Sequence, residues 1–353
     1  MPRDQPFSMK PTNRVVRFHR TGGPEVLQID EIELAALKDN EVLIRVEALA
    51  LCRADILWRE GSYVEDPVLP AQIGYDAAGV VQSVGPEVKT VKPGDRVSTV
   101  PACSLVDYGA HGEEIIYPEN ALFVHPPDLG PEEASSVNTE LFLAYFALVE
   151  LAELQSCQYV VVTAATATTG IAALQLAKML GAKSIAITRS GSKRGELIAA
   201  GAENVIVVGE EDVRDIIFDI TDGLGADLIY DAVGGPGIEE LAWATKRLGR
   251  IIIYGALGAT DEETRLPLGA CFFRGVKVYA GITIFDYTGN RRLRLPPKPG
   301  AVNRAKEFIT KGLAAGNFTP KIDRVFNGLG EYQLAHQHMA TNGRNGRIIV
   351  SLH

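Results

Sequence analysis

The chain has 353 residues. That exceeds the roughly 250–300 residues at which single hydrophobic cores stop growing, so two domains are expected. A hydrophobic fraction of 46% with 22% charged residues is ordinary for a globular enzyme and excludes a disordered or fibrous protein. The formal net charge of −9 argues against nucleic acid or an anionic membrane as the main partner.

The cysteines and the first residues indicate where such a protein works. The polar, proline-containing start MPRDQPFSMKPTNR predicts a frayed leader rather than a signal peptide. No pair of cysteines has the Cys-x-x-Cys spacing, so reduced thiols and a cytoplasmic location are expected for Cys52, Cys103, Cys157 and Cys271. The apolar run from 160 to 180 carries four threonines and a lysine, which favours a buried strand and helix over a membrane span.

Short strands separated by Gly/Pro turns extend from Arg14 to about Pro127 and predict a mostly β domain. Two of these strands are expected at 42–46 and 96–100. The sharp turns of this unit are expected at Gly79, Gly85 and Gly94.

From Pro131 the pattern changes to helices that alternate with apolar, β-branched strands. Apolar helix is expected over 141–154. The further strands are expected at 159–163, 184–188, 204–208, 227–231, 250–254 and 276–280, and the helices between them at 170–180, 193–200, 212–220 and 238–246. Such alternation predicts an α/β fold with a parallel sheet covered on both faces. Six strands in two halves are typical of the doubly wound dinucleotide-binding sheet. A basic, Pro-rich loop, a helix from Ala301 and a strand at 346–351 follow.

The run GYDAAGVVQSVGPEVKTVKPGDRV, from Gly74 to Val97, and the strand, loop and helix over 159–180 carry a family resemblance. They resemble the medium-chain dehydrogenase/reductase superfamily, in its zinc-independent quinone oxidoreductase-like branch, over nearly the whole chain from about Val15. The resemblance implies a GroES-like catalytic domain over 1–130 and a Rossmann NADPH-binding domain over 131–281, with 282–353 returning to the catalytic domain. It also implies a homodimer, paired through the edge of the nucleotide-binding sheet. The alternative is that the apolar strands at 250–254 and 276–280 are simply buried in the sheet, because burial predicts the same apolar pattern as a dimer contact.

The candidate pyrophosphate site is the small-residue loop between the strand at 159–163 and the next helix. Helix N-termini bind anions through free N–H groups and the helix dipole, and the backbone must come close to the ligand. Of the usual glycine-rich pattern only the last glycine remains, so a plain strand–helix connection is the alternative. The candidate contacts are Thr166, Ala167, Thr168, Thr169 and Gly170.

The residues after the strand at 184–188 favour NADPH over NADH. NAD-specific sites carry an acidic residue here that binds the ribose diol, and this chain has none. The arginine guanidinium suits the geometry of a 2′-phosphate. The alternative is a solvated basic turn at a helix start, which has the same sequence pattern. The candidate contacts to this phosphate are Thr188, Arg189, Ser190 and Lys193. The resemblance places the cofactor ribose at Tyr254 and Gly255, and the nicotinamide near Ile282 and Phe285.

Relatives that bind a catalytic zinc use Cys, His and a further Cys as ligands. This chain keeps Cys52, has Tyr75 where the histidine is expected, and has no thiol in Asn138-Thr139-Glu140. A zinc site needs three protein ligands, so no metal is predicted and Cys52 is expected to line the pocket. Without a Lewis acid to stabilise an alkoxide, hydride is best donated to electrophilic, conjugated acceptors.

Two further side chains are candidates for catalysis. Tyr63 maps onto an active-site tyrosine of quinone reductases, where a phenol can donate to the substrate oxygen, and a loop aromatic on the rim is the alternative. A second tyrosine of those enzymes maps onto Leu57 and is lost. Glu140 is either a buried proton source or a helix-surface carboxylate.

These observations predict a zinc-independent, NADPH-dependent reductase of a quinone or an α,β-unsaturated carbonyl (enal, enone or enoyl). A small molecule is the expected partner. A non-catalytic NADPH-binding structural or regulatory protein is one alternative, and a zinc-dependent alcohol dehydrogenase is the other.

Overall fold

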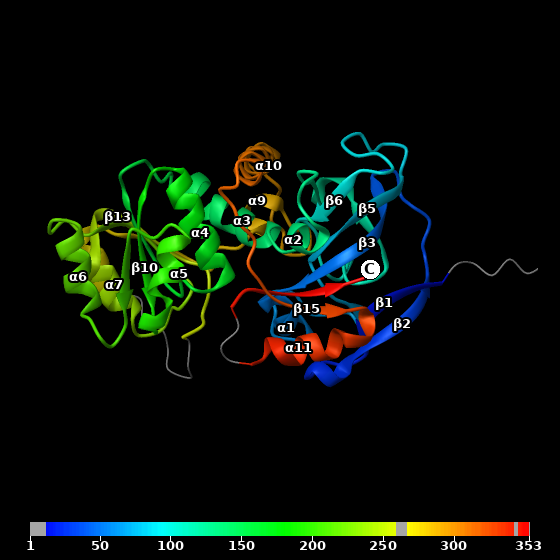
Figure 1. Ribbon diagram of the computed structural model, residues 1–353, viewed down its shortest axis with the longest axis horizontal. Helices are drawn as coiled ribbons and strands as arrows, with labels where there is room; N and C mark the ends of the chain where they lie inside the picture. The colour runs from blue at the N-terminus through cyan, green and yellow to red at the C-terminus, as the bar shows by residue number, and fades with distance from the viewer. Residues whose placement is uncertain (1–11, 259–266, 342–344, 353) are drawn as a thin grey trace, which may run out of the picture. The chain divides into compact units, whose positions relative to one another are not determined.

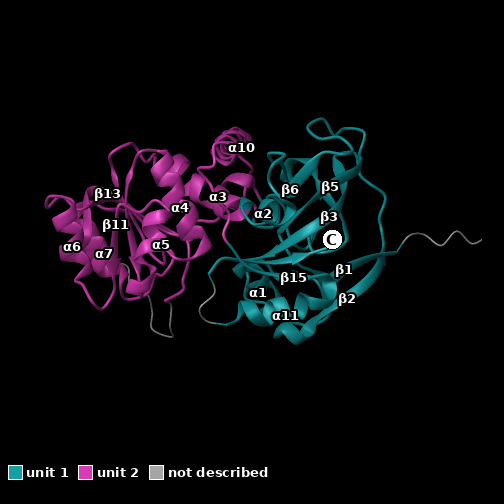
Figure 2. Ribbon diagram, in the orientation of Figure 1, with its two compact units in different colours: residues 1–138, 290–293, 322–353 teal, residues 139–289, 294–321 magenta. Residues whose placement is uncertain are grey.

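The computed structural model describes residues 12–258, 267–341 and 345–352. The polar leader expected at the N-terminus falls mainly on residues 1–11, which lie outside that description. The chain divides into two compact units (Figure 2). Unit 1 comprises Met1–Asn138, Asn290–Leu293 and Ile322–His353, and unit 2 comprises Thr139–Gly289 and Arg294–Lys321. The assignment of 1–130, 131–281 and 282–353 to substrate and cofactor binding stays a prediction.

Unit 2 contains a six-stranded sheet in the order β11-β10-β9-β12-β13-β14 (Figure 1), with every neighbouring pair parallel. The first of these strands in the chain lies in the middle, and the order reverses there. This order is that of the doubly wound dinucleotide-binding fold, and the predicted fold class is confirmed. The strands are β9 (Tyr159–Val162), β10 (Lys183–Thr188), β11 (Asn204–Val207), β12 (Ala226–Asp231), β13 (Thr245–Ile253) and β14 (Lys277–Ala280).

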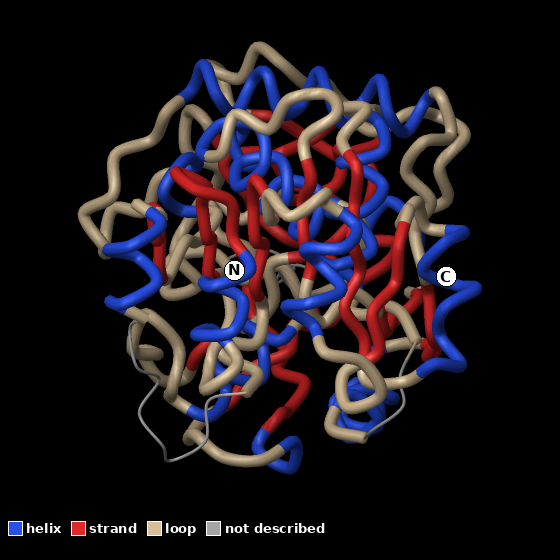
Figure 3. The backbone as a smooth tube through the Cα atoms, turned by 90° about the vertical axis from the view of Figure 1, so that its left-hand side faces the viewer, coloured by secondary structure: helices blue, strands red, loops and turns tan. Residues whose placement is uncertain are grey.

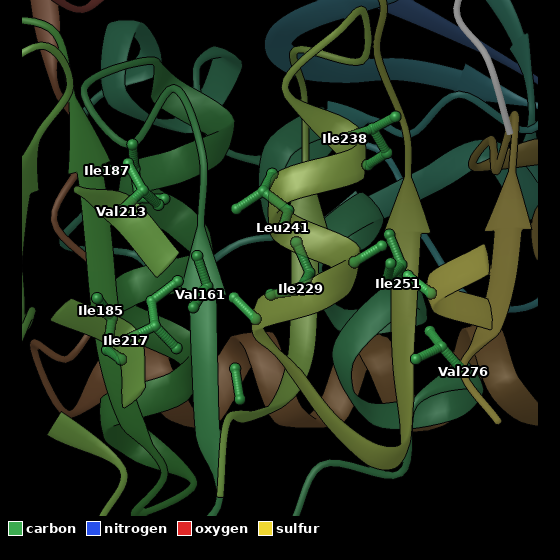
Figure 4. Packing of buried hydrophobic residues seen from close by; sticks show 14 of the residues in the cluster. Val161, Ile185, Ile187, Val213, Ile217, Ile229, Ile238, Leu241, Ile251 and Val276 are labelled. Carbon is green, nitrogen blue, oxygen red and sulfur yellow. The ribbon is translucent and has the colours of Figure 1, made fainter. Parts of the chain in front are cut away.

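Helices flank these strands (Figure 3). Apolar side chains from the strands pack against apolar faces of the helices in a buried cluster, in which Figure 4 shows Val161, Ile229 and Ile251 near Leu241. Burying one such side chain is worth about 1.5–3 kcal/mol, so this cluster stabilises the sheet edge that holds the loops. The helices of unit 2 are α3 (Asn138–Tyr145), α4 (Thr168–Met179), α5 (Arg194–Ala199), α6 (Val213–Ile220), α7 (Ile238–Ala244), α8 (Leu268–Arg274), α9 (Phe285–Thr288) and α10 (Pro299–Ala314).

Two predicted helices end earlier than expected. The one at 238–246 stops at Ala244, because Thr245 already pairs with Ala226 as the first residue of β13. The apolar helix over 141–154 begins as α3 and continues from Phe146 to Leu151 as a π-helix. Residues 141–154 are apolar on most sides, so their pattern does not distinguish an α-turn from the wider π-turn.

The apolar run over 160–180 forms β9 and α4, as predicted. Within residues 12–258, 267–341 and 345–352, no helix has both the length and the apolar character that a membrane span requires.

Unit 1 is built on a larger sheet in the order β15-β16-β3-β5-β6-β8, with β7 also paired to β3, and a small sheet in the order β2-β1-β4. β16 pairs antiparallel with β3 and parallel with β15, so a distant part of the chain completes the sheet. The strands are β1 (Thr12–Phe18), β2 (Leu27–Glu33), β3 (Glu41–Leu51), β4 (Ala71–Gln72), β5 (Asp76–Val84), β6 (Arg96–Thr99), β7 (Glu114–Pro118), β8 (Leu122–Val124), β15 (Ile322–Asn327) and β16 (Arg347–Ser351); the helices are α1 (Arg53–Glu60), α2 (Pro131–Ser135) and α11 (Tyr332–Met339).

Only one of the three glycines predicted at sharp turns depends on turn geometry. Gly94 has φ +91° and lies between β5 and β6. Gly79 instead lies inside β5, where an added Cβ would come within 2.1 Å of the Arg45 carbonyl oxygen of β3. Gly85 is similar, with the Lys38 carbonyl oxygen 2.2 Å away. These two glycines permit close backbone approach, which a sequence pattern does not distinguish from a turn.

Candidate active site

The loop from β9 to α4 has the close backbone packing expected of a phosphate cradle. A Cβ added at Gly170 would lie 2.7 Å from the Ala165 Cα and 2.9 Å from the Ala164 oxygen, so only glycine fits. Ala167 precedes the helix and has no side chain that can accept the first N–H groups, which an α-helix leaves without internal partners. Thr166 and Thr169 are half-buried beside them. The helix end therefore offers donors to an anion.

The Thr168 side chain already forms a hydrogen bond, with Glu140 of α3. Its hydroxyl donates to Glu140 Oε1 at 3.0 Å, and Glu140 is only 5% exposed. The alternative of a helix-surface carboxylate is therefore wrong. Burial, Tyr254 and the Glu140 charge together raise the pKa of the nearby Tyr230 phenol well above its ordinary value. The structure thus brings Glu140 and Thr168 together at the first turn of α4, and the role of Glu140 as a proton source stays a prediction.

The turn after β10 presents one unpaired cation. Arg189 and Ser190 are exposed, and Arg189 forms no ion pair among the described residues. Lys193 is engaged by Glu196 at 3.0 Å. Thr188 is buried and its hydroxyl accepts the Ser190 N–H at 3.3 Å, which shapes the turn. Of the four predicted phosphate contacts, Arg189 is the most available.

The ends of β12 and β13 hold a stacked pair of phenols, Tyr230 and Tyr254, with ring centroids 4.0 Å apart. Asp231 orders the adjacent turn, accepting from the Thr163 hydroxyl at 2.5 Å and from the Gly234 N–H at 2.7 Å. A Cβ at Gly255 would come within 2.6 Å of the Ala232 oxygen, so the two strand ends approach closely. Carboxyl ends of parallel strands are where this fold binds dinucleotides.

Ile282 and Phe285 follow β14. The Ile282 N–H donates to Ile253 at 3.3 Å, and its side chain is half-buried. The Phe285 ring is buried at the start of α9. Their contact with the nicotinamide and the substrate stays a prediction.

In unit 1, Tyr63 sits among aromatic side chains. Its ring centroid lies 6.3 Å from that of Trp58, edge to face, and 6.2 Å from that of Tyr75. Burial raises the pKa of the Tyr63 phenol far above its ordinary value. Its side chain is half-buried rather than fully enclosed. Tyr63 is therefore a neutral donor at neutral pH, with part of its surface accessible.

Cys52 lies at the N-terminus of α1. Its backbone N–H donates to the Asp55 carboxylate at 2.7 Å. Burial raises the pKa of the Cys52 thiol well above its usual range, so the thiol stays protonated. Because the thiolate is the form that attacks carbon, Cys52 is poorly suited as a nucleophile in this structure.

The position of the expected zinc histidine holds a phenol. Tyr75 is buried and its pKa is raised well above the ordinary value, chiefly by desolvation. Among the residues that the structure describes, no three His, Cys, Asp or Glu side chains come together as a metal site would require. These residues do not fit a catalytic zinc ion.

Sequence reasoning missed several buried groups behind Cys52 and Tyr75. Asp76 forms an ion pair with Arg347, both fully buried. The His111 ring hydrogen-bonds the Tyr332 hydroxyl. In both pairs the two residues are distant in the chain, so no local sequence pattern predicts the contact. Asp231 was more accessible to prediction, since it is an acid at the end of a buried strand.

The doubly wound sheet and its close-packed loop are those of a nucleotide-dependent oxidoreductase. Family models for a "Zinc-binding dehydrogenase" and an "Alcohol dehydrogenase GroES-like domain" match residues 168–291 and 38–127. Quinone oxidoreductase 1 of Escherichia coli is 33% identical over 72% of this chain and 76% of that protein. A quinone oxidoreductase-like protein 2 homolog of Nematostella vectensis is 33% identical over 99% of this chain and 93% of its own length.

The solved structure of Escherichia coli quinone oxidoreductase complexed with NADPH superposes with a TM-score of 0.80 at 26% identity. It covers 96% of this chain and 100% of that one. The chain belongs to the medium-chain dehydrogenase/reductase superfamily, in its quinone oxidoreductase-like branch.

Proposed function

We propose that the chain is a zinc-independent, NADPH-dependent reductase that transfers hydride to a quinone or an α,β-unsaturated carbonyl. The observation that carries this proposal is the close-packed loop at Gly170 together with the unpaired Arg189 after β10. The E. coli quinone oxidoreductase that superposes on this chain is complexed with NADPH. A small-molecule acceptor follows from membership of this family, and a cytoplasmic location stays a prediction.

The residues of unit 2 fit NADPH. The cradle at Gly170 and the bare helix end of α4 suit a pyrophosphate, and Arg189 suits the 2′-phosphate that distinguishes NADPH from NADH. Tyr254 and Gly255, at the end of β13, suit the ribose. Bound NADPH supplies a hydride.

The chain's own side chains then stabilise and protonate the reduced acceptor. Tyr63, a neutral phenol, donates a hydrogen bond to the substrate oxygen where negative charge develops. Glu140, buried beside Thr168, is the proposed proton source. Cys52, protonated and nearly buried, lines the substrate side without taking part in proton transfer.

Zinc independence rests on the chemistry of the retained side chains. Tyr75 stands where zinc-binding relatives have a histidine, and Asn138-Thr139-Glu140 holds no thiol, so Cys52 alone does not make the three-ligand set that zinc needs. Alcohol oxidation needs alkoxide stabilisation, which these residues do not provide. Reduction of a conjugated acceptor needs only hydrogen-bond donors.

We also propose a homodimer through the outer edge of the unit 2 sheet. β14 is an edge strand, and α8, which packs against the neighbouring β13, exposes apolar side chains, with Phe272 84% exposed. Exposed apolar clusters of this kind mark protein interfaces. The cluster comprises Leu248, Leu268, Phe272 and Phe273.

The test is NADPH oxidation by protein dialysed against a metal chelator, with an ortho-quinone and a medium-chain 2-enal offered in parallel. Turnover of either acceptor supports the proposal, and the faster one defines the substrate class. Activity that returns only with added zinc would instead support a zinc-dependent alcohol dehydrogenase. Tight NADPH binding without any turnover would support the non-catalytic alternative.

A further inference from the structure

The loop that carries Tyr63 depends on side chains for its position. It connects α1 to β4, and from 63 to 69 it forms no backbone-to-backbone hydrogen bond among the described residues. Tyr63 packs on Trp58 and on Tyr75, which hold its ring but not the residues that follow it in the loop. Another contact must hold the following residues.

Glu65 provides that contact from two residues further along. Its side chain is 7% exposed, and both carboxylate oxygens are engaged. Oε2 accepts from the Ser104 hydroxyl at 2.5 Å, and Oε1 accepts from the Asn290 amide nitrogen. One carboxylate therefore joins the Tyr63 loop to two segments of unit 1 that are distant in the chain.

The two donors are themselves fixed. The Asn290 side-chain oxygen accepts the N–H groups of Arg292 and Leu293 at 2.9 and 3.0 Å, so the amide cannot turn over without losing both bonds. The Ser104 hydroxyl accepts the Val106 N–H at 3.1 Å. Other hydrogen bonds thus orient the Ser104 and Asn290 donors toward Glu65.

A carboxylate in this place is chemically specific. Glu65 forms no ion pair within the described residues, and burying a carboxylate without a cation is costly unless hydrogen bonds satisfy it. Two donors directed at two oxygens match Glu better than any neutral residue. Asn290 also lies two residues after Thr288, the last residue of α9, whose first residue is the predicted nicotinamide contact Phe285.

We propose that Glu65 is a positioning residue, and that its bonds to Ser104 and Asn290 hold the Tyr63 hydroxyl where it donates to the substrate oxygen. This inference rests on the proposed role of Tyr63. Glu65 itself touches neither the substrate nor the cofactor in this scheme; its effect on catalysis passes through Tyr63.

A double-mutant cycle in kcat tests the proposal, with the acceptors named above and the NADPH Kd measured by nicotinamide fluorescence. Glu65→Ala is expected to lower kcat by roughly ten-fold or more, as misplacing one catalytic group does, and to leave the NADPH Kd unchanged. Glu65→Gln should lose less, because its amide oxygen still accepts from Asn290 and its NH₂ group donates to the Ser104 hydroxyl. The exposed neighbour Asp66 supplies the control: Asp66→Ala should match wild type.

The decisive comparison is made in the Tyr63→Phe background, where Glu65→Ala should cause no further loss of kcat. If the two substitutions instead lower kcat independently, so that their fold-losses multiply in the double mutant, Glu65 does not act through Tyr63. That outcome overturns the positioning role of Glu65 and keeps Tyr63 as a catalytic residue. Full kcat in Tyr63→Phe alone would refute both.

Two further measurements cover failure of Glu65→Ala to fold or absence of turnover. Ser104→Ala should give a smaller loss that also vanishes in the Tyr63→Phe background. Amide hydrogen exchange should become faster over 61–70 in Ser104→Ala, which removes one of the two bonds, than in wild type. Unchanged exchange over this loop would refute the proposal without reference to activity.

Discussion

The substitution Gly170→Ala sets two opposing effects against each other at the phosphate loop. Gly170 lies in the first turn of α4, where alanine would gain about 0.5–1 kcal/mol of helix stability over glycine. The new Cβ would lie 2.7 Å from the Ala165 Cα and within 3 Å of two carbonyl oxygens, all backbone atoms. Relieving such overlap typically costs about 1–3 kcal/mol. We expect the cost of the steric overlap to exceed the gain in helix propensity, so that the free energy of unfolding falls by about 1–2 kcal/mol.

The same displacement should weaken cofactor binding. The loop atoms that must move are those expected to contact the pyrophosphate, and each 1.4 kcal/mol lost is about ten-fold in affinity. Titration of nicotinamide fluorescence should therefore show an NADPH Kd raised by roughly ten-fold or more. Differential scanning fluorimetry with and without NADPH should show a lower Tm and a smaller shift on binding.

Gly195→Ala is the matched control, because nothing lies within 4 Å of a Cβ at that position in α5. It should stabilise the protein by up to about 1 kcal/mol and leave the NADPH Kd unchanged. An NADPH Kd unaltered in Gly170→Ala, together with a raised Tm, would refute the close-packing argument for the cradle.

Three further predictions concern stability, cofactor choice and assembly. Burial lowers the pKa of His111 to about 3 from 6.5, so the folded state keeps it neutral. Stability is then full above about pH 6.5 and falls below it by up to about 1.4 kcal/mol per unit. Urea unfolding should show about 2 kcal/mol lost between pH 7 and 5, and an invariant unfolding free energy would contradict this. Arg189→Ala should raise the NADPH Kd about ten-fold or more and spare that of NADH, whereas equal losses would exclude a 2′-phosphate contact. Phe272→Asp should convert a dimer into a monomer by light scattering; a wild-type monomer would reject the dimer.

The sheet of unit 2 was predictable because its strands are apolar on both faces. β9 to β14 appear as β-branched runs at regular spacing, and most predicted boundaries agree within a residue or two. The largest error was at β13, which begins at Thr245 through an irregular pairing that includes Leu248 at φ +64°. Irregular backbone of this kind has no periodic signature.

The site was predictable only where chemistry follows a local pattern. The small-residue loop and the basic turn with Arg189 are each contiguous, so sequence alone indicated them. Glu140 is different, because the hydrogen bond that places it beside Thr168 joins residues of two separate helices, α3 and α4. The bonds of Glu65 to Ser104 and Asn290 join three distant segments, which one sequence without an alignment does not reveal.

The position of β16 bears on how the protein folds during synthesis. β16 lies between β15 and β3 in the unit 1 sheet, although the ribosome makes β3 long before β16. All six strands of the unit 2 sheet are made before β16 emerges. The nascent chain should therefore carry a native-like nucleotide-binding sheet while the edge of β3 is still open. An open strand edge is prone to wrong pairing, and protection of β3 by chaperones would matter most during this interval.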